Sequence, residues 1–216
     1  MVKIFFFSIM LFFSVSIFSQ NKFEMGIFAG TSYYLGDINP SRQFYSVAPS
    51  FGGTMRYNFN NRYALRLNGL YGGLSGDDLD FNNEFQQQRA EFFNTNFFEV
   101  DLQLEFNFMP FLPVDNKTLF SPFVYSGIGY SLLLARGNNQ LILPMGIGFK
   151  YSFRRRLTLN FEWGFRKTFA DNLDGVSNFG SEDYTSAFHN NDWYSVAGIG
   201  ISFRLFDSSG NCPVYE

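Results

Sequence analysis

Cysteine and histidine are nearly absent from this 216-residue sequence, which contains one of each, Cys212 and His189. A single cysteine excludes an internal disulfide, so the fold cannot rest on a disulfide framework. Charged residues make up only 16% of the chain, below the roughly 25% of an ordinary soluble domain. The formal net charge of −3 gives no indication of a nucleic-acid partner.

Long apolar runs are also scarce, and the one that is present lies at the N-terminus. Lys3 precedes an almost wholly apolar stretch over residues 4–18, and Ser19 supplies a small residue before Gln20. This order is typical of a cleaved secretory signal peptide. The alternative is a retained membrane helix, but no stop-transfer charges follow. We expect residues 1–19 to be the signal peptide.

No later run approaches the roughly 18 apolar residues of a membrane-spanning helix. What the chain does contain is aromatic residues, 21% of the total, in segments that alternate apolar and polar positions. Successive side chains of a strand point to opposite faces, so such segments have one apolar and one polar face. Eight of them occur, over residues 23–34, 51–59, 63–71, 98–108, 120–134, 141–153, 157–166 and 193–205.

The segments have about the ten to fourteen residues that a tilted strand needs to cross hydrocarbon. Connections at 60–61 and 154–156 are short, whereas those at 35–47, 72–95 and 170–192 are long and polar. Outer-membrane barrels have this asymmetry, with short turns and both termini on the periplasmic side. The sequence therefore predicts an all-β, eight-stranded antiparallel transmembrane barrel over residues 20–206.

The alternative is a soluble barrel or sandwich, in which the apolar face points inward. Side-chain size separates the two, because a small barrel interior has little room for many Phe, Leu, Met, Trp and Tyr residues. Glycine recurs on the polar face, where small residues suit a narrow lumen. These considerations favour a membrane barrel whose partner is outer-membrane lipid. The glycines are Gly52, Gly146, Gly148, Gly164, Gly198 and Gly200.

The predicted inner face balances its charges. Eight strands leave an interior that side chains just fill, so charges there must be paired. A charge-selective channel would leave one sign in excess; the balance instead predicts a lumen closed by ion pairs, with Arg56, Arg66, Glu99, Asp101 and Glu105 in one cluster. The five cations and five anions are Arg56, Arg66, Lys150, Arg166 and Arg204, and Glu24, Glu99, Asp101, Glu105 and Glu162.

The sequence offers no support for catalysis or for a cofactor. Some outer-membrane barrels hydrolyse lipids with His and Ser, but the run around His189 lacks the nearby serine of a lipid A deacylase. Loop carboxylates at residues 77–80, 171–174 and 182–183 match no calcium-loop spacing. We therefore predict a protein that is not an enzyme, with no small-molecule substrate identified.

The run Tyr-Tyr-Leu-Gly-Asp-Ile-Asn-Pro at residues 33–40 and the patch Ser-Gly-Asp-Asp at 75–78 resemble the PorG-type barrels of the type IX secretion system of Bacteroidetes. Residues 62–66, 99–107 and 123–129 are similar in character. The resemblance implies a barrel of OmpA-like size that acts in protein secretion and gliding motility. It also implies a periplasmic ring, built from the lipoprotein PorK and its partner PorN, which the barrel anchors. The alternative is an OmpA-like or adhesin barrel whose outer loops bind an external ligand.

Residues 207–216 form a C-terminal tail that we place on the periplasmic side. Its thiol has no partner within the chain, and a leftover thiol in an exported protein suggests an intermolecular contact. A short apolar stretch follows and could dock in extended form against another protein. The alternative is a disordered extension. The candidate contact residues are Cys212, Pro213, Val214 and Tyr215.

Overall fold

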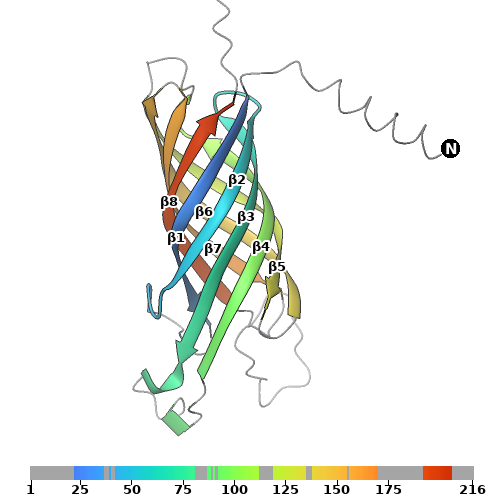
Figure 1. Ribbon diagram of the computed structural model, residues 1–216, viewed down its shortest axis with the longest axis vertical. Coiled ribbons are helices and arrows are strands. Elements are labelled where there is room, and N and C mark those ends of the chain that lie inside the picture. The colour runs from blue at the N-terminus through green and yellow to red at the C-terminus, as the bar shows by residue number, and fades with distance from the viewer. Residues whose placement is uncertain are drawn as a thin grey trace, which may run out of the picture.

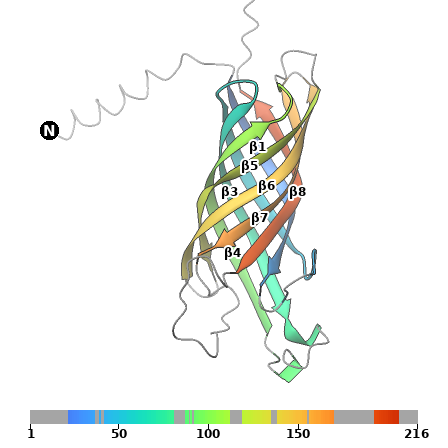
Figure 2. The ribbon, with the colours of Figure 1, turned by 180° about the vertical axis from the view of Figure 1, so that it is seen from behind.

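The computed structural model describes residues 22–36, 39, 42–80, 87–88, 90, 92–111, 119–134, 138–154, 156–169 and 192–205. Their eight strands form one closed antiparallel barrel, in which each strand pairs with its chain neighbours and β1 closes against β8 (Figures 1 and 2). This confirms the predicted fold. The strands are β1 (Phe23–Leu35), β2 (Ala48–Asn58), β3 (Tyr63–Asp77), β4 (Phe92–Asn107), β5 (Phe120–Leu133), β6 (Asn138–Arg154), β7 (Leu157–Thr168) and β8 (Trp193–Arg204).

The β3–β4 hairpin is longer than the sequence predicted, and it extends beyond the other strands at one end of the barrel (Figure 1). The stretch 72–95 was expected to be a loop. Instead, residues from Gly72 to Asp77 pair with residues from Phe97 to Phe92. The prediction was wrong there because Gly, Ser and Asn, which are typical of loops, conceal the inward-facing Leu74, Phe93 and Phe97. Another predicted loop, 135–140, includes the start of β6.

The outer surface of the barrel is apolar. On β4, the outward-facing Phe98, Val100, Leu102 and Leu104 are 40–52% exposed, whereas Glu99, Asp101, Gln103 and Glu105 between them are at most 2% exposed. Large apolar side chains are exposed on the other strands in the same way. A soluble barrel would have the opposite polarity, because its apolar face would be hidden from water. The exterior is therefore a surface for contact with lipid.

The first and last strands begin and end at the same end of the barrel as the short turns. There, the Asn58 amide donates to the Lys22 carbonyl, and the Leu205 amide donates to the Phe23 carbonyl. Aromatic rings gather on the outside at this end, as in the aromatic girdles of membrane barrels. Ring contacts join Phe23 to Tyr57, Tyr57 to Phe59, Tyr63 to Phe106 and Phe106 to Phe108.

Beyond the strands, the structure contains a 3-10 turn, η1 (Asp78–Asp80), directly after β3. In the described part of the chain, no helix is long and apolar enough to cross a membrane. The predicted signal peptide, the loop that carries His189 and the C-terminal tail lie outside the described residues.

Candidate functional site: a lumen closed in two layers

A layer of buried charges crosses the barrel near its short-turn end. Arg56 of β2 donates to Glu105 of β4 from two nitrogens, with Nε–Oε2 and Nη2–Oε1 distances of 2.9 and 3.1 Å. Its third nitrogen, Nη1, donates to Glu24 of β1 at 3.0 Å. Arg204 of β8 donates to the other oxygen of Glu24, also at 3.0 Å. The Glu24 contacts join paired strands, whereas the contact between Arg56 and Glu105 ties β2 to β4, which are not neighbours in the sheet.

Glu105 is the centre of this polar layer. Besides Arg56, it has ion pairs with Lys150 of β6 and with Arg66 of β3, whose Nε lies 3.0 Å from Oε1. Arg66 also donates to Glu162 of β7 and covers the ring of Tyr125 at 4.8 Å. One carboxylate therefore faces three cations, and the guanidinium planes allow the close, multiple hydrogen bonds that a buried charge requires.

The ten charged residues predicted to line the lumen all lie on the inner face, and nine of them take part in ion pairs. The exception is Asp101, which accepts a hydrogen bond from Asn68 Nδ2 at 2.9 Å. The prediction of one cluster is confirmed for Arg56, Arg66 and Glu105 but is wrong for Glu99 and Asp101. Glu99 pairs with Arg166 at 3.2 Å, apart from Glu105, because the two glutamates are six positions apart on β4, or about 20 Å along the strand.

A second, apolar layer fills the lumen toward the long-loop end, where the sequence had predicted a polar face. The rings of Phe97 and Tyr194 lie 5.0 Å apart, and those of Tyr34 and Phe93 lie 4.9 Å apart. Tyr194 links this layer to the charges by donating its hydroxyl to Glu99 at 2.6 Å. Each of these residues is an even number of positions from an inward-facing charge or neighbour on its own strand. That alternation was the feature of the sequence from which their inward orientation could have been predicted. The buried cluster comprises Tyr34, Leu70, Leu74, Phe93, Phe97, Leu133, Ile142, Tyr194 and Val196.

Glycines on the inner face make room for large side chains and for close strand approach. A Cβ at Gly164 would lie 2.0 Å from the Tyr125 hydroxyl oxygen, and a Cβ at Gly146 would lie 2.6 Å from the same ring. At Gly127, a Cβ would lie 2.1 Å from the backbone oxygen of Leu102. The frequent glycines of the polar face are therefore places where the lumen is too crowded for any side chain.

The connection between β1 and β2 folds against the outside of the barrel. Phe44, which has a left-handed φ of 57°, stacks on Trp163 of β7 at 6.2 Å and lies 4.9 Å from the Tyr33 ring. Trp163 Nε1 donates to the Tyr33 hydroxyl at 3.0 Å, and that hydroxyl donates to Gln43 at 2.8 Å. Tyr33 faces outward yet is fully buried, so this connection covers part of the predicted lipid surface.

The same connection is fixed to β1 and to the β3–β4 hairpin. Buried Asn39 donates its amide to the backbone oxygens of Tyr34 and Arg42, at 2.9 and 2.7 Å. The Tyr45 hydroxyl donates to Asp80 at 2.6 Å. Burial and this hydrogen bond to the carboxylate raise the pKa of Tyr45 to about 12. We call residues 42–47 and 75–80 the outer ledge.

One group of predicted site residues, the contact residues of the C-terminal tail, lies outside the part of the chain that the structure describes. The candidate contact residues Cys212, Pro213, Val214 and Tyr215 lie outside the described residues, as does His189. Within the described ranges, no three His, Cys, Asp or Glu residues gather in a manner that could hold a metal ion.

An apolar exterior, a closed antiparallel sheet and a filled interior define the class of this protein as an eight-stranded outer-membrane β-barrel. The family described as a domain of unknown function, DUF6089, matches residues 3–215, and the chain belongs to this family. Its domain description states no activity.

Solved structures with the same fold include Neisserial surface protein A, at a TM-score of 0.54 and 10% identity over 85% of this chain and 97% of that one. OprG from Pseudomonas aeruginosa has a TM-score of 0.46 and 12% identity over 86% and 98% of the two chains. Ail of Yersinia pestis, in complex with the heparin analogue sucrose octasulfate, has a TM-score of 0.47 and 12% identity over 85% of this chain and 99% of that one. The likeness to Neisserial surface protein A shows the fold alone. No curated protein sequence matches significantly.

Proposed function

We propose that this chain is a non-enzymatic outer-membrane barrel of the type IX protein secretion and gliding apparatus, and that it positions the periplasmic ring of PorK and PorN. The observation that carries the proposal is the lumen, which ion pairs around Glu105 and an aromatic layer around Tyr194 close one above the other. A barrel filled in this way has no path for cargo. Its role in secretion is then to hold other components, as the resemblance at residues 33–40 and 75–78 implies.

The proposal places the short-turn end, and with it both termini, in the periplasm. Exposed arginines mark the turns of this end, with Arg62 before β3, Arg154 at the end of β6 and Arg156 before β7. A basic rim offers a complementary surface for an acidic partner. The tail after β8 leaves from the same end, and in this proposal Cys212 and the following Pro213-Val214-Tyr215 contact the ring.

The test is deletion of the gene followed by complementation. We expect loss of type IX export in the deletion strain and its return with the full chain. A chain truncated after Phe206 should insert in the membrane but co-purify with less PorK and PorN. Intact export in the deletion strain would contradict the proposal, whereas wild-type co-purification of the truncated barrel would contradict only the tail contact.

A cross-link through Cys212 has its own test. Non-reducing gels of native membranes should show a higher-mass band that disappears with reductant. The conservative variant Cys212→Ser, which keeps the tail but removes the thiol, should lack the band while still binding the ring. The same band in Cys212→Ser would overturn the cross-link.

A second candidate function is an adhesin or OmpA-like barrel that binds a ligand outside the cell. The observation that favours it is the projecting β3–β4 hairpin with the outer ledge beside it, where Phe44, Val47, Leu79 and Phe92 are 49–78% exposed. Deleting the gene separates the two candidates, because an adhesin predicts altered surface adhesion with unchanged type IX export.

A further inference from the structure

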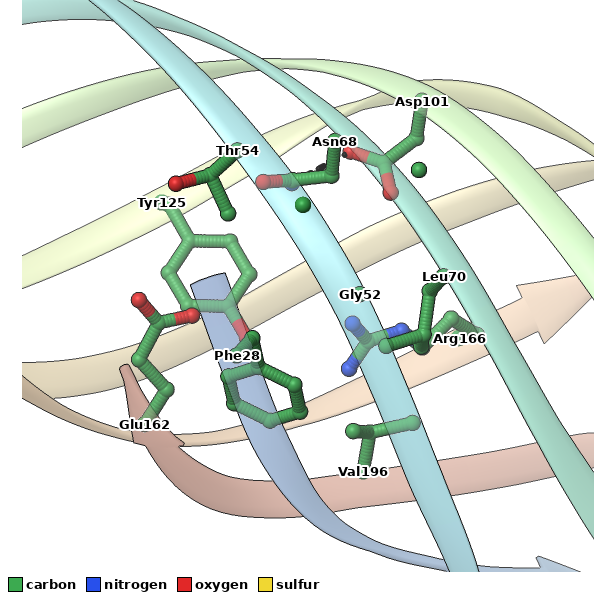
Figure 3. A pocket seen from close by; sticks show the side chains of 12 residues that line it. Phe28, Gly52, Thr54, Asn68, Leu70, Asp101, Tyr125, Glu162, Arg166 and Val196 are labelled. Carbon is green, nitrogen blue, oxygen red and sulfur yellow. Dashed lines mark hydrogen bonds between the residues drawn. The ribbon is translucent and has the colours of Figure 1, made fainter. Parts of the chain in front are cut away.

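A small cavity of about 20 Å³ lies inside the barrel, between the polar and the apolar layer. It has room for about one water-sized occupant. Its lining comes from seven of the eight strands. Figure 3 shows Asn68 and Asp101 next to each other on one side, with Thr54, Tyr125, Glu162 and Arg166 around the remainder.

Two buried oxygens of this lining have no hydrogen-bond partner, namely Asp101 Oδ2 and Asn68 Oδ1. Both side chains are at least nine-tenths buried, with exposures of 2% for Asp101 and 9% for Asn68. The amide orientation is determined by the carboxylate, because only Nδ2 can donate to Asp101 Oδ1. Buried polar atoms are nearly always satisfied, so two orphan acceptors in one cavity indicate an occupant that both can bind.

The local charge indicates what that occupant is. Glu99 and Asp101 lie on the same face of β4, but the one cation of this group, Arg166, is paired with Glu99. Among the described residues, Asp101 has no ion-pair partner. The remaining inward cations cannot compensate it, since they are held in the polar layer by Glu24, Glu105 and Glu162. The charges are therefore distributed unevenly along a lumen that is neutral as a whole. Four cations face three carboxylates in the polar layer, whereas at the cavity Arg166 alone faces Glu99 and Asp101, which leaves one negative charge uncompensated there.

We propose that this cavity binds one small monovalent cation of the size of sodium, with Asp101 Oδ2 and Asn68 Oδ1 as ligands. Hard cations take oxygen ligands, and a single positive charge neutralises Asp101 where bridging water would leave its charge uncompensated. A divalent ion fits less well, because Arg166 lines the same cavity and Glu162 is already paired with Arg66. The proposal is independent of the role in secretion.

The test is the thermal unfolding midpoint of the full chain, refolded in detergent micelles with sodium chloride or with choline chloride at equal ionic strength. Choline is too large for the cavity. We expect sodium to raise the midpoint in a saturable manner that choline does not reproduce. The variant Asp101→Asn should lose this difference, while Asp77→Asn, the same change at the rim of β3, should keep it.

If Asp101→Asn fails to fold, Asn68→Leu serves instead, because it keeps the carboxylate but removes the second ligand. Asn68→Leu should need a higher sodium concentration for the half-maximal rise of the unfolding midpoint. Equal responses to sodium and choline in the wild-type barrel would overturn the proposal and indicate ionic strength alone. A midpoint that depends on pH but not on sodium would also overturn it, and would show that a proton rather than a cation neutralises Asp101.

Discussion

Arg56 and Glu105 form a two-point ion pair across the lumen, although β2 and β4 are not paired in the sheet. Both side chains are at most 2% exposed. Two parallel hydrogen bonds fix the relative position of the groups as well as their charge. The pair therefore holds β2 and β4 together across the intervening strand β3.

Removing Glu105 should strongly destabilise the barrel. In Glu105→Ala, the cations Arg56, Arg66 and Lys150 lose a shared partner, and breaking a buried ion pair costs about 3–5 kcal/mol. Urea-induced unfolding in lipid vesicles measures the loss. Gln103→Ala is the control on the same face of β4, and it should cost less because Arg66 keeps two carboxylates. Equal losses in the two variants would show that charge pairing is not the cause.

An arginine on the outer face should destabilise the barrel more, the deeper it lies in the bilayer. Leu102 is outward, 43% exposed and central among the apolar residues of β4. Leu102→Arg should destabilise the barrel by about 2–4 kcal/mol if it lies at the bilayer midplane, and Phe108→Arg, at the end of the strand, by about 0–1 kcal/mol. Vesicle unfolding curves provide both values. Similar values at the two positions would argue against the membrane depth assigned to β4.

Two glycines on opposite faces should respond differently to the same substitution. Gly127→Ala places a Cβ within 2.1 Å of the Leu102 backbone oxygen, and such overpacking costs about 1–3 kcal/mol. At Gly69, nothing lies within 4 Å of the added Cβ, so Gly69→Ala should be tolerated. The refolding yield and the unfolding midpoint of each variant, measured against the wild type, provide the comparison. A tolerated Gly127→Ala would mean that β4 and β5 are further apart than the structure indicates.

The two closing layers predict little ion conductance. With ion pairs across the polar layer and buried rings across the apolar layer, planar bilayers that contain the full barrel should show no large, steady current. A triple change of Tyr34, Phe97 and Tyr194 to Ala should still not open a wide pore, because the polar layer remains. Large ion-selective currents in the wild-type protein would refute a closed lumen.

The hydrogen bond from Tyr45 to Asp80, which joins the two segments of the outer ledge, should be lost at high pH. Its pKa is raised from 10.0 to about 12 in the folded protein, so the folded state favours the neutral phenol. The stabilisation is complete below pH 10 and is lost as the pH rises through about 12. Comparing tyrosinate absorbance in the wild type and in Tyr45→Phe isolates this residue. A Tyr45 transition at its ordinary pKa would contradict the buried contact with Asp80.

Much of the architecture was predictable, because strand alternation is a local property. Phe98, Val100, Leu102 and Leu104 could be assigned to one face from their spacing alone, and the same reasoning placed all ten charges on the other. The extended hairpin was missed because its inward residues Leu74 and Phe93 stand among loop-like neighbours. Their inward orientation depends on pairing with a partner strand nearly twenty positions away in the chain.

The sequence by itself determined eight strands, their two faces and a charge-balanced interior. Only the tertiary structure decided that Glu99 pairs with Arg166 rather than with the cations around Glu105. It also decided that aromatic rings close the lumen toward the long-loop end and that Phe44 covers Tyr33. The physical reason is that alternation repeats every two residues along one chain segment. Contacts across a lumen depend instead on the tilt and stagger of all eight strands after closure, and no short stretch of sequence contains that information.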